Sequence, residues 1–289
     1  MINTPAHLGL DFAVLTAAVV AGVAAAPALL GGWPGDSLTS SVLEEEDCRA
    51  RQHERTAMPT VHFPDVRRPD AGTALVSQWI VSAPELQHRA ADLLIAEWER
   101  QDDRPDAMLS LTAFLSEDGL RILFYAQWTD DDAHRAWART RRPATVGRID
   151  EELPGIQRPG LVRYALGRSH LPADAAGRNP GLLVTPAFRT DGPATQRRLA
   201  GTVLAILEEE QVPGLLGAHF HLSKDGEQVL NFAEWEDEQQ WRRFAEHSAA
   251  PRLRAALESI EGVTFLNTFG NAARYRPYAS LVNVEPPVR

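Results

Sequence analysis

Four residues towards the end of the chain have types and spacing that suit proton transfer and hydrogen bonding to a substrate: His219, His221, Asn231 and Trp235. An asparagine amide donates a hydrogen bond without taking a proton, and an indole offers a second N–H donor on a flat ring. Histidine exchanges protons near neutral pH. Such a set can assist a proton transfer and donate hydrogen bonds to an oxyanion.

A β-hairpin must position these residues. Two β-prone runs flank Lys224-Asp225-Gly226, and glycine accepts the positive φ of a tight turn. The sequence favours a three-residue loop, in which Ser223 opposes Glu227 and His219 opposes Asn231. Because strand side chains alternate, that register predicts one face with His219, His221, Asn231, Ala233 and Trp235, and an opposite face with Phe220, Leu230 and Phe232. A four-residue loop would move the histidines off the face of Asn231.

The same stretch occurs earlier in the chain at a constant offset. The segment 116–119 matches 223–226, and 125–128 matches 232–235, with offsets of 223 − 116 = 107 and 235 − 128 = 107. A fixed offset between matching turns and strands indicates an internal duplication. Each copy reads strand, helix, strand, hairpin turn, strand, helix, strand.

The apolar periodicity predicts the elements of both copies. In copy one we expect strands at 73–81, 108–115, 121–128 and 161–166, and helices at 86–98, after a capping box at 82–85, and at 130–139. In copy two we expect strands at 181–188 and 263–269 besides the hairpin, and helices at 194–210 and 237–247, with a break at Pro251 before 252–260. The tail at 274–278 could cover a neighbouring sheet edge.

A β-α-β-β-α-β unit is the ferredoxin-like topology, whose sheet carries helices on one face only. The bare apolar face must be buried elsewhere, and a duplicated chain can bury it by pressing its two sheets together. The sequence therefore predicts an α+β fold of two tandem ferredoxin-like repeats that form one pseudo-dimeric α+β barrel.

Composition limits the organisation and the class of partner. The net charge of −10 over 289 residues argues against nucleic-acid binding, and the single Cys48 cannot form an internal disulfide or a metal cluster. We expect an extension at 1–72, repeat one at 73–169, a linker at 170–180 and repeat two at 181–289. We interpret 1–57 as a mistaken start or a disordered extension, ahead of a membrane anchor, and expect a cytoplasmic protein.

At the hairpin the chain resembles a known family. The run Asn231-Phe232-Ala233-Glu234-Trp235 resembles the Asn-Tyr-Ala-Gln-Trp signature of the antibiotic biosynthesis monooxygenases, and Tyr125-Ala126-Gln127-Trp128 matches its end. The resemblance covers residues 73 to about 278. It implies dimeric α+β barrels with a cavity between sheet and helices. It also implies oxidation of aromatic polyketide anthrones or phenols to quinones by molecular oxygen, without flavin, haem or metal.

Carried over residue by residue, the resemblance implies that Asn231, Trp235 and His221 are catalytic. We expect substrate contacts from His219, Thr185, Trp241 and Phe244. In copy one the matching positions hold Phe124 (231 − 107) and Phe114 (221 − 107), and only Trp128 survives. The sequence therefore predicts one working cavity, in copy two.

Other functions remain open for the same barrel. A polyketide cyclase or a non-catalytic binding barrel would share the fold, since fold does not fix reaction. A haem-degrading enzyme, with His247 as axial ligand, is a further alternative. The expected partners are a small aromatic polyketide and molecular oxygen, with neither nucleic acid nor membrane, and pairing of whole chains stays open.

Overall fold

The computed structural model describes residues 61, 63–101, 104–266 and 274–283. The interpretation of residues 1–57 as a mistaken start, a disordered extension or an anchor lies outside this part of the chain, as does the end of the predicted strand at 263–269. None of the helices in the described ranges has the length and apolar character needed to cross a membrane.

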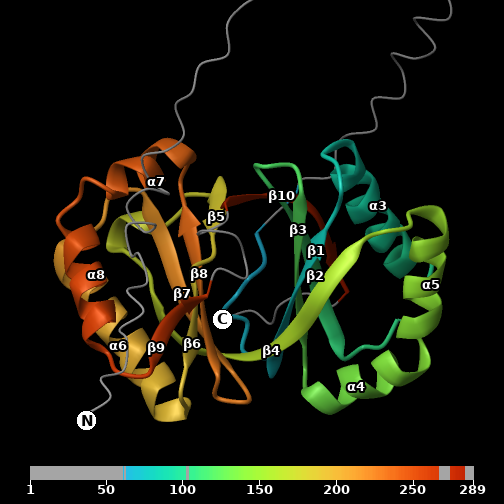
Figure 1. Cartoon of the computed structure of the whole chain (residues 1–289), viewed down its shortest axis with the longest axis horizontal. Helices are drawn as coiled ribbons and strands as arrows, with labels where there is room; N and C mark the ends of the chain where they lie inside the picture. Colours follow the sequence, from blue (N-terminus) through green and yellow to red (C-terminus); the bar gives the residue numbers. More distant parts are fainter. Residues whose placement is uncertain (1–60, 62, 102–103, 267–273, 284–289) are drawn as a thin grey trace, which may run out of the picture.

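The strands form one antiparallel sheet that closes on itself (Figure 1). The ring runs β5-β10-β2-β3-β1-β4-β7-β8, and a β5–β8 pairing closes it, while β6 and β9 extend from β8. The bounds are β1 Thr73–Ile80, β2 Met108–Ser116, β3 Arg121–Trp128, β4 Gln157–His170, β5 Leu182–Val184, β6 Ala187–Thr190, β7 Leu215–Ser223, β8 Gln228–Trp235, β9 Val263–Leu266 and β10 Arg274–Val282.

Helices cover the two outer flanks of this barrel (Figure 1). The helices of the first half are α3 Glu85–Glu99, α4 Asp131–Thr140 and α5 Arg142–Glu152. The helices of the second half are α6 Pro193–Glu210, α7 Glu238–Phe244 and α8 Ala249–Ser259, and a short 3-10 turn, η1 Ala173–Ala175, lies between the halves in sequence. The predicted pseudo-dimeric α+β barrel of tandem ferredoxin-like repeats is confirmed.

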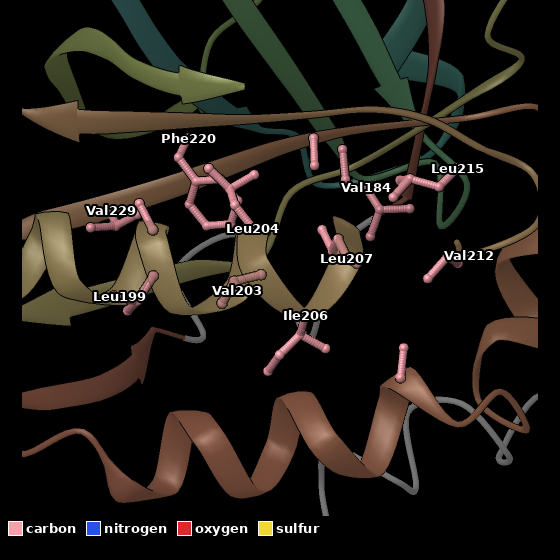
Figure 2. Close-up of a cluster of buried hydrophobic side chains, with 14 of the residues drawn as sticks. Val184, Leu199, Val203, Leu204, Ile206, Leu207, Val212, Leu215, Phe220 and Val229 are labelled. Carbon is pink, nitrogen blue, oxygen red and sulfur yellow. The ribbon is translucent and has the colours of Figure 1, made fainter. Parts of the chain in front are cut away.

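The apolar side chains divide into three cores. One fills the barrel interior and includes Phe114, Tyr125, Leu230 and Phe232. The other two lie between the sheet and the helices of each half. In Figure 2, which shows the outer core of the second half, Phe220 lies between the sheet and α6 beside Leu204. The predicted interior positions of Leu230 and Phe232 are therefore confirmed, whereas that of Phe220 is wrong.

The two hairpin turns are built from the same hydrogen bonds. Ser116 Oγ donates to Asp118 Oδ1 at 2.6 Å, and Ser223 Oγ donates to Asp225 Oδ1 at 2.6 Å. In each repeat a glutamine from the preceding helix, Gln87 in the first and Gln196 in the second, donates its side-chain N–H groups to two backbone carbonyls. One carbonyl lies at the start of the turn and the other at its end. The offset of this glutamine is 196 − 87 = 109, so copy one carries two extra residues between helix and hairpin.

The repeats exchange their closing strands. β4 of repeat one pairs with its own β1 and with β7 of repeat two. In the same way β10 pairs with β5 and with β2 of repeat one. The prediction that the tail covers a neighbouring sheet edge is thus confirmed, and the exchange leaves the two halves joined by main-chain hydrogen bonds on both sides.

Several local predictions were wrong for identifiable reasons. The capping box fails because Pro84 occupies the N-cap and no side chain caps α3. Helix α5 was not predicted, since its apolar face is short. Thr185 and Pro186 separate β5 from β6, because proline cannot donate to the ladder. Pro251 lies in the first turn of α8, where proline is tolerated, and does not end a helix.

Gly226→Ala should lower the free energy of unfolding by about 1–3 kcal/mol. Gly226 has φ of 85°, and a Cβ there would lie 2.9 Å from Cδ of Pro193. The matched control is Gly147→Ala in α5, where a Cβ meets nothing within 4 Å and where alanine should add up to about 1 kcal/mol. Urea unfolding measures both changes, and equal midpoints for the two variants would contradict the role of the turn.

Candidate functional site

The β7–β8 hairpin has a four-residue loop, one residue more than predicted. His219 pairs with Phe232, and Phe220 pairs with Asn231. The loop closes at Gln228 because Ser223 Oγ accepts the Gln228 N–H at 2.8 Å. The prediction that His219 and His221 share a face with Asn231 and Trp235 is therefore wrong. The histidines face the barrel interior, while Asn231 and Trp235 face the helices of repeat two.

Asn231 is the polar residue on an otherwise apolar, helix-facing stripe of β8. Its neighbours on that stripe, Val229 and Ala233, are buried in the outer core. Its N–H donates to the Pro186 carbonyl at 2.9 Å. Its side-chain Oδ1 is buried and has no hydrogen-bond partner among the described residues, although the residue as a whole remains partly exposed. The Oδ1 atom is thus unsatisfied, and a ligand hydroxyl could complete its hydrogen bonding.

An aromatic wall lies next to this amide along the strand. Trp235 is buried, and its ring centroid lies 5.4 Å from that of Phe244 at an interplanar angle of 55°. Trp241 is buried in the same core, and the Arg274 guanidinium lies 4.9 Å from its ring centroid. The structure therefore brings Asn231, Trp235, Trp241 and Phe244 to one side of the sheet, where flat rings could contact an aromatic molecule.

His221 lies on the opposite side, fully buried in the barrel. Its Nδ1 lies 3.1 Å from the His219 carbonyl oxygen, and its Nε2 lies 3.0 Å from the Tyr125 hydroxyl. Because a carbonyl only accepts, the proton sits on Nδ1 and Tyr125 donates to Nε2. Burial, together with the neighbouring His219, lowers the pKa of His221 to about 3, and burial raises the pKa of Tyr125. This pair is neutral at physiological pH.

The buried His221 should make stability depend on pH. Its folded pKa of about 3 lies below the usual value of about 6.5. Between these values the unfolded chain binds a proton that the folded chain does not, so stability falls as the pH falls from about 6.5 towards 3. Each such group contributes about 1.4 kcal/mol per pH unit.

The double variant His221→Phe, Tyr125→Phe tests this dependence. His221→Phe places in repeat two the phenylalanine that repeat one has at Phe114. Tyr125→Phe removes the hydroxyl that would otherwise lose its hydrogen-bond partner. Urea unfolding at pH 7, 6 and 5 should show a shallower dependence on pH than in the unchanged protein, with the difference in slope approaching about 1.4 kcal/mol per pH unit at pH 5. An unchanged slope would mean that His221 titrates normally.

Thr185 and His219 also lie away from Asn231. The register of the flanking pairs places Thr185 opposite Phe232, on the barrel-facing side, and its Oγ1 is buried without a described partner. His219 Nδ1 lies 2.8 Å from Ser169 Oγ. The expected substrate contacts from Thr185 and His219 therefore cannot come from the side of the sheet that carries Asn231.

The family comparison concerns the second repeat. Residues 193–258, which run from α6 through the hairpin into α8, match the family model described as antibiotic biosynthesis monooxygenase. The second repeat is thus similar to the antibiotic biosynthesis monooxygenase (ABM) family. Over 74 residues the chain is 39% identical to the tetracenomycin-F1 monooxygenase of Streptomyces glaucescens, a match covering 25% of this chain and 63% of that protein. The chain thus spans less than two thirds of this curated relative's length.

A solved structure shares the fold. An anthrone oxidase-like protein aligns with 76% of this chain and 97% of its own length, with a TM-score of 0.57 and 13% identity. A Streptomyces coelicolor monooxygenase from the gene ActVA-Orf6, solved with nanaomycin D, is 36% identical over 30% of this chain and 86% of its own, with a TM-score of 0.27.

In repeat one, a buried aromatic side chain occupies the position that is polar in repeat two. Phe124, at the place of Asn231, is buried with its centroid 5.0 Å from that of Trp79. Trp128 packs against Trp98 and Trp137, which stack on each other at 4.6 Å. Continuous aromatic packing thus takes the place of the unpartnered amide, as predicted from the offset of 107.

Sequence reasoning missed two partners of the candidate residues. Tyr125 as the partner of His221 was not predicted, although the offset of 107 aligns Tyr125 with Phe232 and so places it in the barrel. Ser169 as the partner of His219 was also missed, because the exchange of β4 between the halves is not visible in the spacing. His247, the haem ligand of the alternative function, accepts the Ala249 N–H on its Nδ1 at 3.2 Å.

Proposed function

We propose that this protein is a cofactor-independent monooxygenase that oxidises an aromatic polyketide, an anthrone or a phenol, to a quinone with molecular oxygen. The observation that carries the proposal is the buried, unpartnered Oδ1 of Asn231 beside an aromatic wall. A buried polar atom without a partner costs about 1–3 kcal/mol, and a bound substrate would remove that cost. The match to the ABM family, and a relative named for tetracenomycin F1, support this substrate class.

Asn231 and Trp235 have separate roles in this reaction. The Asn231 side chain orients the substrate and its amide N–H stabilises the enolate oxygen, in surroundings where a hydrogen bond is stronger than in water. The Trp235 indole packs the flat ring system and offers its N–H to the developing peroxide. The resemblance to the ABM signature supports both assignments, and Trp241 and Phe244 complete the apolar wall.

The reaction balances without an external electron donor. An anthrone methylene loses its proton to give an enolate, which transfers electrons to oxygen and forms a carbon–oxygen bond. Loss of water from the hydroperoxide then leaves the quinone carbonyl, so that one oxygen atom enters the product and the other leaves as water. Because both histidines of the hairpin lie on the barrel side of the sheet, the substrate proton passes to water, and the enolate is favoured by hydrogen bonding alone.

Oxygen dependence tests the proposal. Purified protein, treated with a chelator and freed of small molecules, is incubated with emodinanthrone in air and under nitrogen. We expect quinone absorbance in air only, with one oxygen molecule consumed for each quinone formed. Turnover under nitrogen would identify a cyclase, and activity that is lost on chelation or restored only by flavin would reject the cofactor-free reaction.

A further inference from the structure

A second cluster of reactive side chains lies on the barrel side of β7, away from Asn231. His219 is buried, its Nδ1 lies 2.8 Å from Ser169 Oγ, and its Nε2 lies 3.6 Å from Glu234 Oε2. A proton on Nε2 faces the carboxylate, so the lone pair on Nδ1 faces the serine and accepts its hydroxyl proton. A serine, a histidine and a carboxylate in this order form a nucleophile, a general base and a group that orients the base.

Gly217 is the position that lets the histidine and the carboxylate meet. It pairs with Glu234 across the strands, and β7 has an irregular register between Leu215 and Gly217. A Cβ at residue 217 would lie 2.6 Å from His219 Nε2 and 3.0 Å from Glu234 Oε2. Any side chain at this position would therefore displace one of the two groups.

The serine of this cluster opens onto a groove. Its volume is about 440 Å³, and it is lined by Arg67, Leu166, Gly167, Arg168, Ser169 and Leu171. Leu166 and Leu171 are exposed apolar side chains. Arg67 is exposed and forms no ion pair with a carboxylate in the described ranges. The Arg168 side chain is also exposed, but its guanidinium lies towards α6, beside Gly201. The groove thus offers both apolar contacts and uncompensated positive charge to a ligand.

The groove also borders a free strand edge. β4 pairs with β1 only as far as Tyr164, while its pairing with β7 continues to His170, with an irregular register between Leu166 and Arg168. Backbone N–H groups that point away from β7 along this stretch therefore have no β1 partner. Such groups are the donors that an oxyanion intermediate of acyl transfer requires.

We propose that Ser169 and His219 form a second active site, a serine esterase site for a carboxylic ester that carries a negative charge. Ser169 Oγ bonds to the ester carbonyl carbon while its proton passes to His219 Nδ1. The bond to the alcohol oxygen then breaks, and His219 returns the proton to that oxygen. Water attacks the acyl-serine by the same route, which releases the carboxylic acid and restores Ser169.

Repeat one provides a natural contrast for this site. Ser280 of β10 pairs with Thr112 of β2, at the place where Ser169 pairs with His219. The offset of 107 aligns Thr112 with His219 and Gln127 with Glu234, and Gln127 accepts a hydrogen bond from Ser110 at 2.7 Å. This half holds a serine in the equivalent place, but without the base.

Labelling with an alkyl fluorophosphonate tests the site directly. We expect the probe to modify Ser169, and mass spectrometry should show the label lost in Ser169→Ala and kept in Ser280→Ala. His219→Gln should slow labelling by about tenfold or more, because the serine loses its base. An unlabelled protein, or equal labelling rates for His219→Gln and the unchanged protein, would overturn the proposal.

Ester hydrolysis tests the substrate class. Mono(4-nitrophenyl) glutarate, which is anionic, should be hydrolysed about fivefold faster than 4-nitrophenyl acetate, because Arg67 attracts its carboxylate. Arg67→Gln should remove this preference. No preference for the anionic ester would overturn the assignment of substrate charge. Neither assay involves an anthrone or oxygen, so their outcome is separate from that of the oxygenase.

Discussion

Asn231→Ala should lower the rate of quinone formation by about 100-fold, since loss of one positioned donor to an oxyanion typically costs about 10²–10³ in rate. The same change should leave stability almost unaltered, because the amide removed has an unpartnered, buried Oδ1. The reason is that an unsatisfied polar atom costs free energy in the folded protein, and its removal offsets the lost packing.

Steady-state rates with emodinanthrone and urea midpoints measure these two effects on the same preparations. Asn231→Phe is a sharper version, because it places in repeat two the residue that repeat one has at Phe124, and it should also abolish turnover. If Asn231→Ala turns over at the rate of the unchanged protein, this amide has no part in the reaction. The assignment of repeat two as the working half would then lose its main support.

Phe124→Ala should show the reverse pattern, a loss of about 3–5 kcal/mol of stability with the turnover of the folded protein retained. Phe124 is buried in the outer core of repeat one, edge-on to Trp79 at 5.0 Å between centroids. Truncation leaves a cavity that rigid aromatic neighbours cannot fill.

Phe124→Leu keeps this prediction testable if the alanine variant fails to fold. It removes less volume and should cost a smaller part of the same free energy. Urea unfolding gives the stabilities, and the quinone assay at low temperature gives the rate for each folded variant. A large loss of turnover in Phe124→Leu, at unchanged folded fraction, would show that repeat one takes part in the chemistry.

Much of the architecture was predictable because the duplication repeats its structural residues. Matching turns at an offset of 107 predicted both hairpins, and the bare apolar faces predicted the closed barrel that the structure contains. The replacement of Asn231 by Phe124 in the other half follows from the same offset. The sequence therefore already showed that repeat two has an amide side chain where repeat one has an aromatic ring.

The register of the hairpin was not predictable from glycine alone. Glycine with positive φ suits loops of three or four residues, and a change of one residue moves each side chain of one strand relative to the other. The loop length is fixed by Ser223, whose Oγ donates to Asp225 and accepts from Gln228. The Ser-x-Asp-Gly sequence that recurs in both turns determines the loop length, but it does so through hydrogen bonds that the spacing does not reveal.

The position of Thr185 depended on a shift of the first strand of repeat two. Leu182 pairs with Trp235 as Thr73 pairs with Trp128, so this strand follows an offset of 182 − 73 = 109 and not 107. Thr185 then corresponds to Val76 (185 − 109), which is part of the barrel core. The apolar pattern of the strand does not reveal a shift of two residues, because such a shift preserves its alternation.

The position of Ser169 depended on the exchange of strands between the halves. Ser169 meets His219 only because β4 continues beyond its pairing with β1 and pairs with β7 of repeat two. Strand alternation predicts which side chains share a face, but it does not predict which strand lies next to which. This contact therefore left no signal in the spacing of the sequence.

The position of a bound product tests the central claim most directly. A crystal structure of the protein with a hydroxylated anthraquinone should place the ligand on the helix-facing side of β8, with a ligand oxygen about 3 Å from the Asn231 amide and the ring system against Trp235. A ligand found in the barrel interior beside His221, or beside Phe124 in repeat one, would contradict the account.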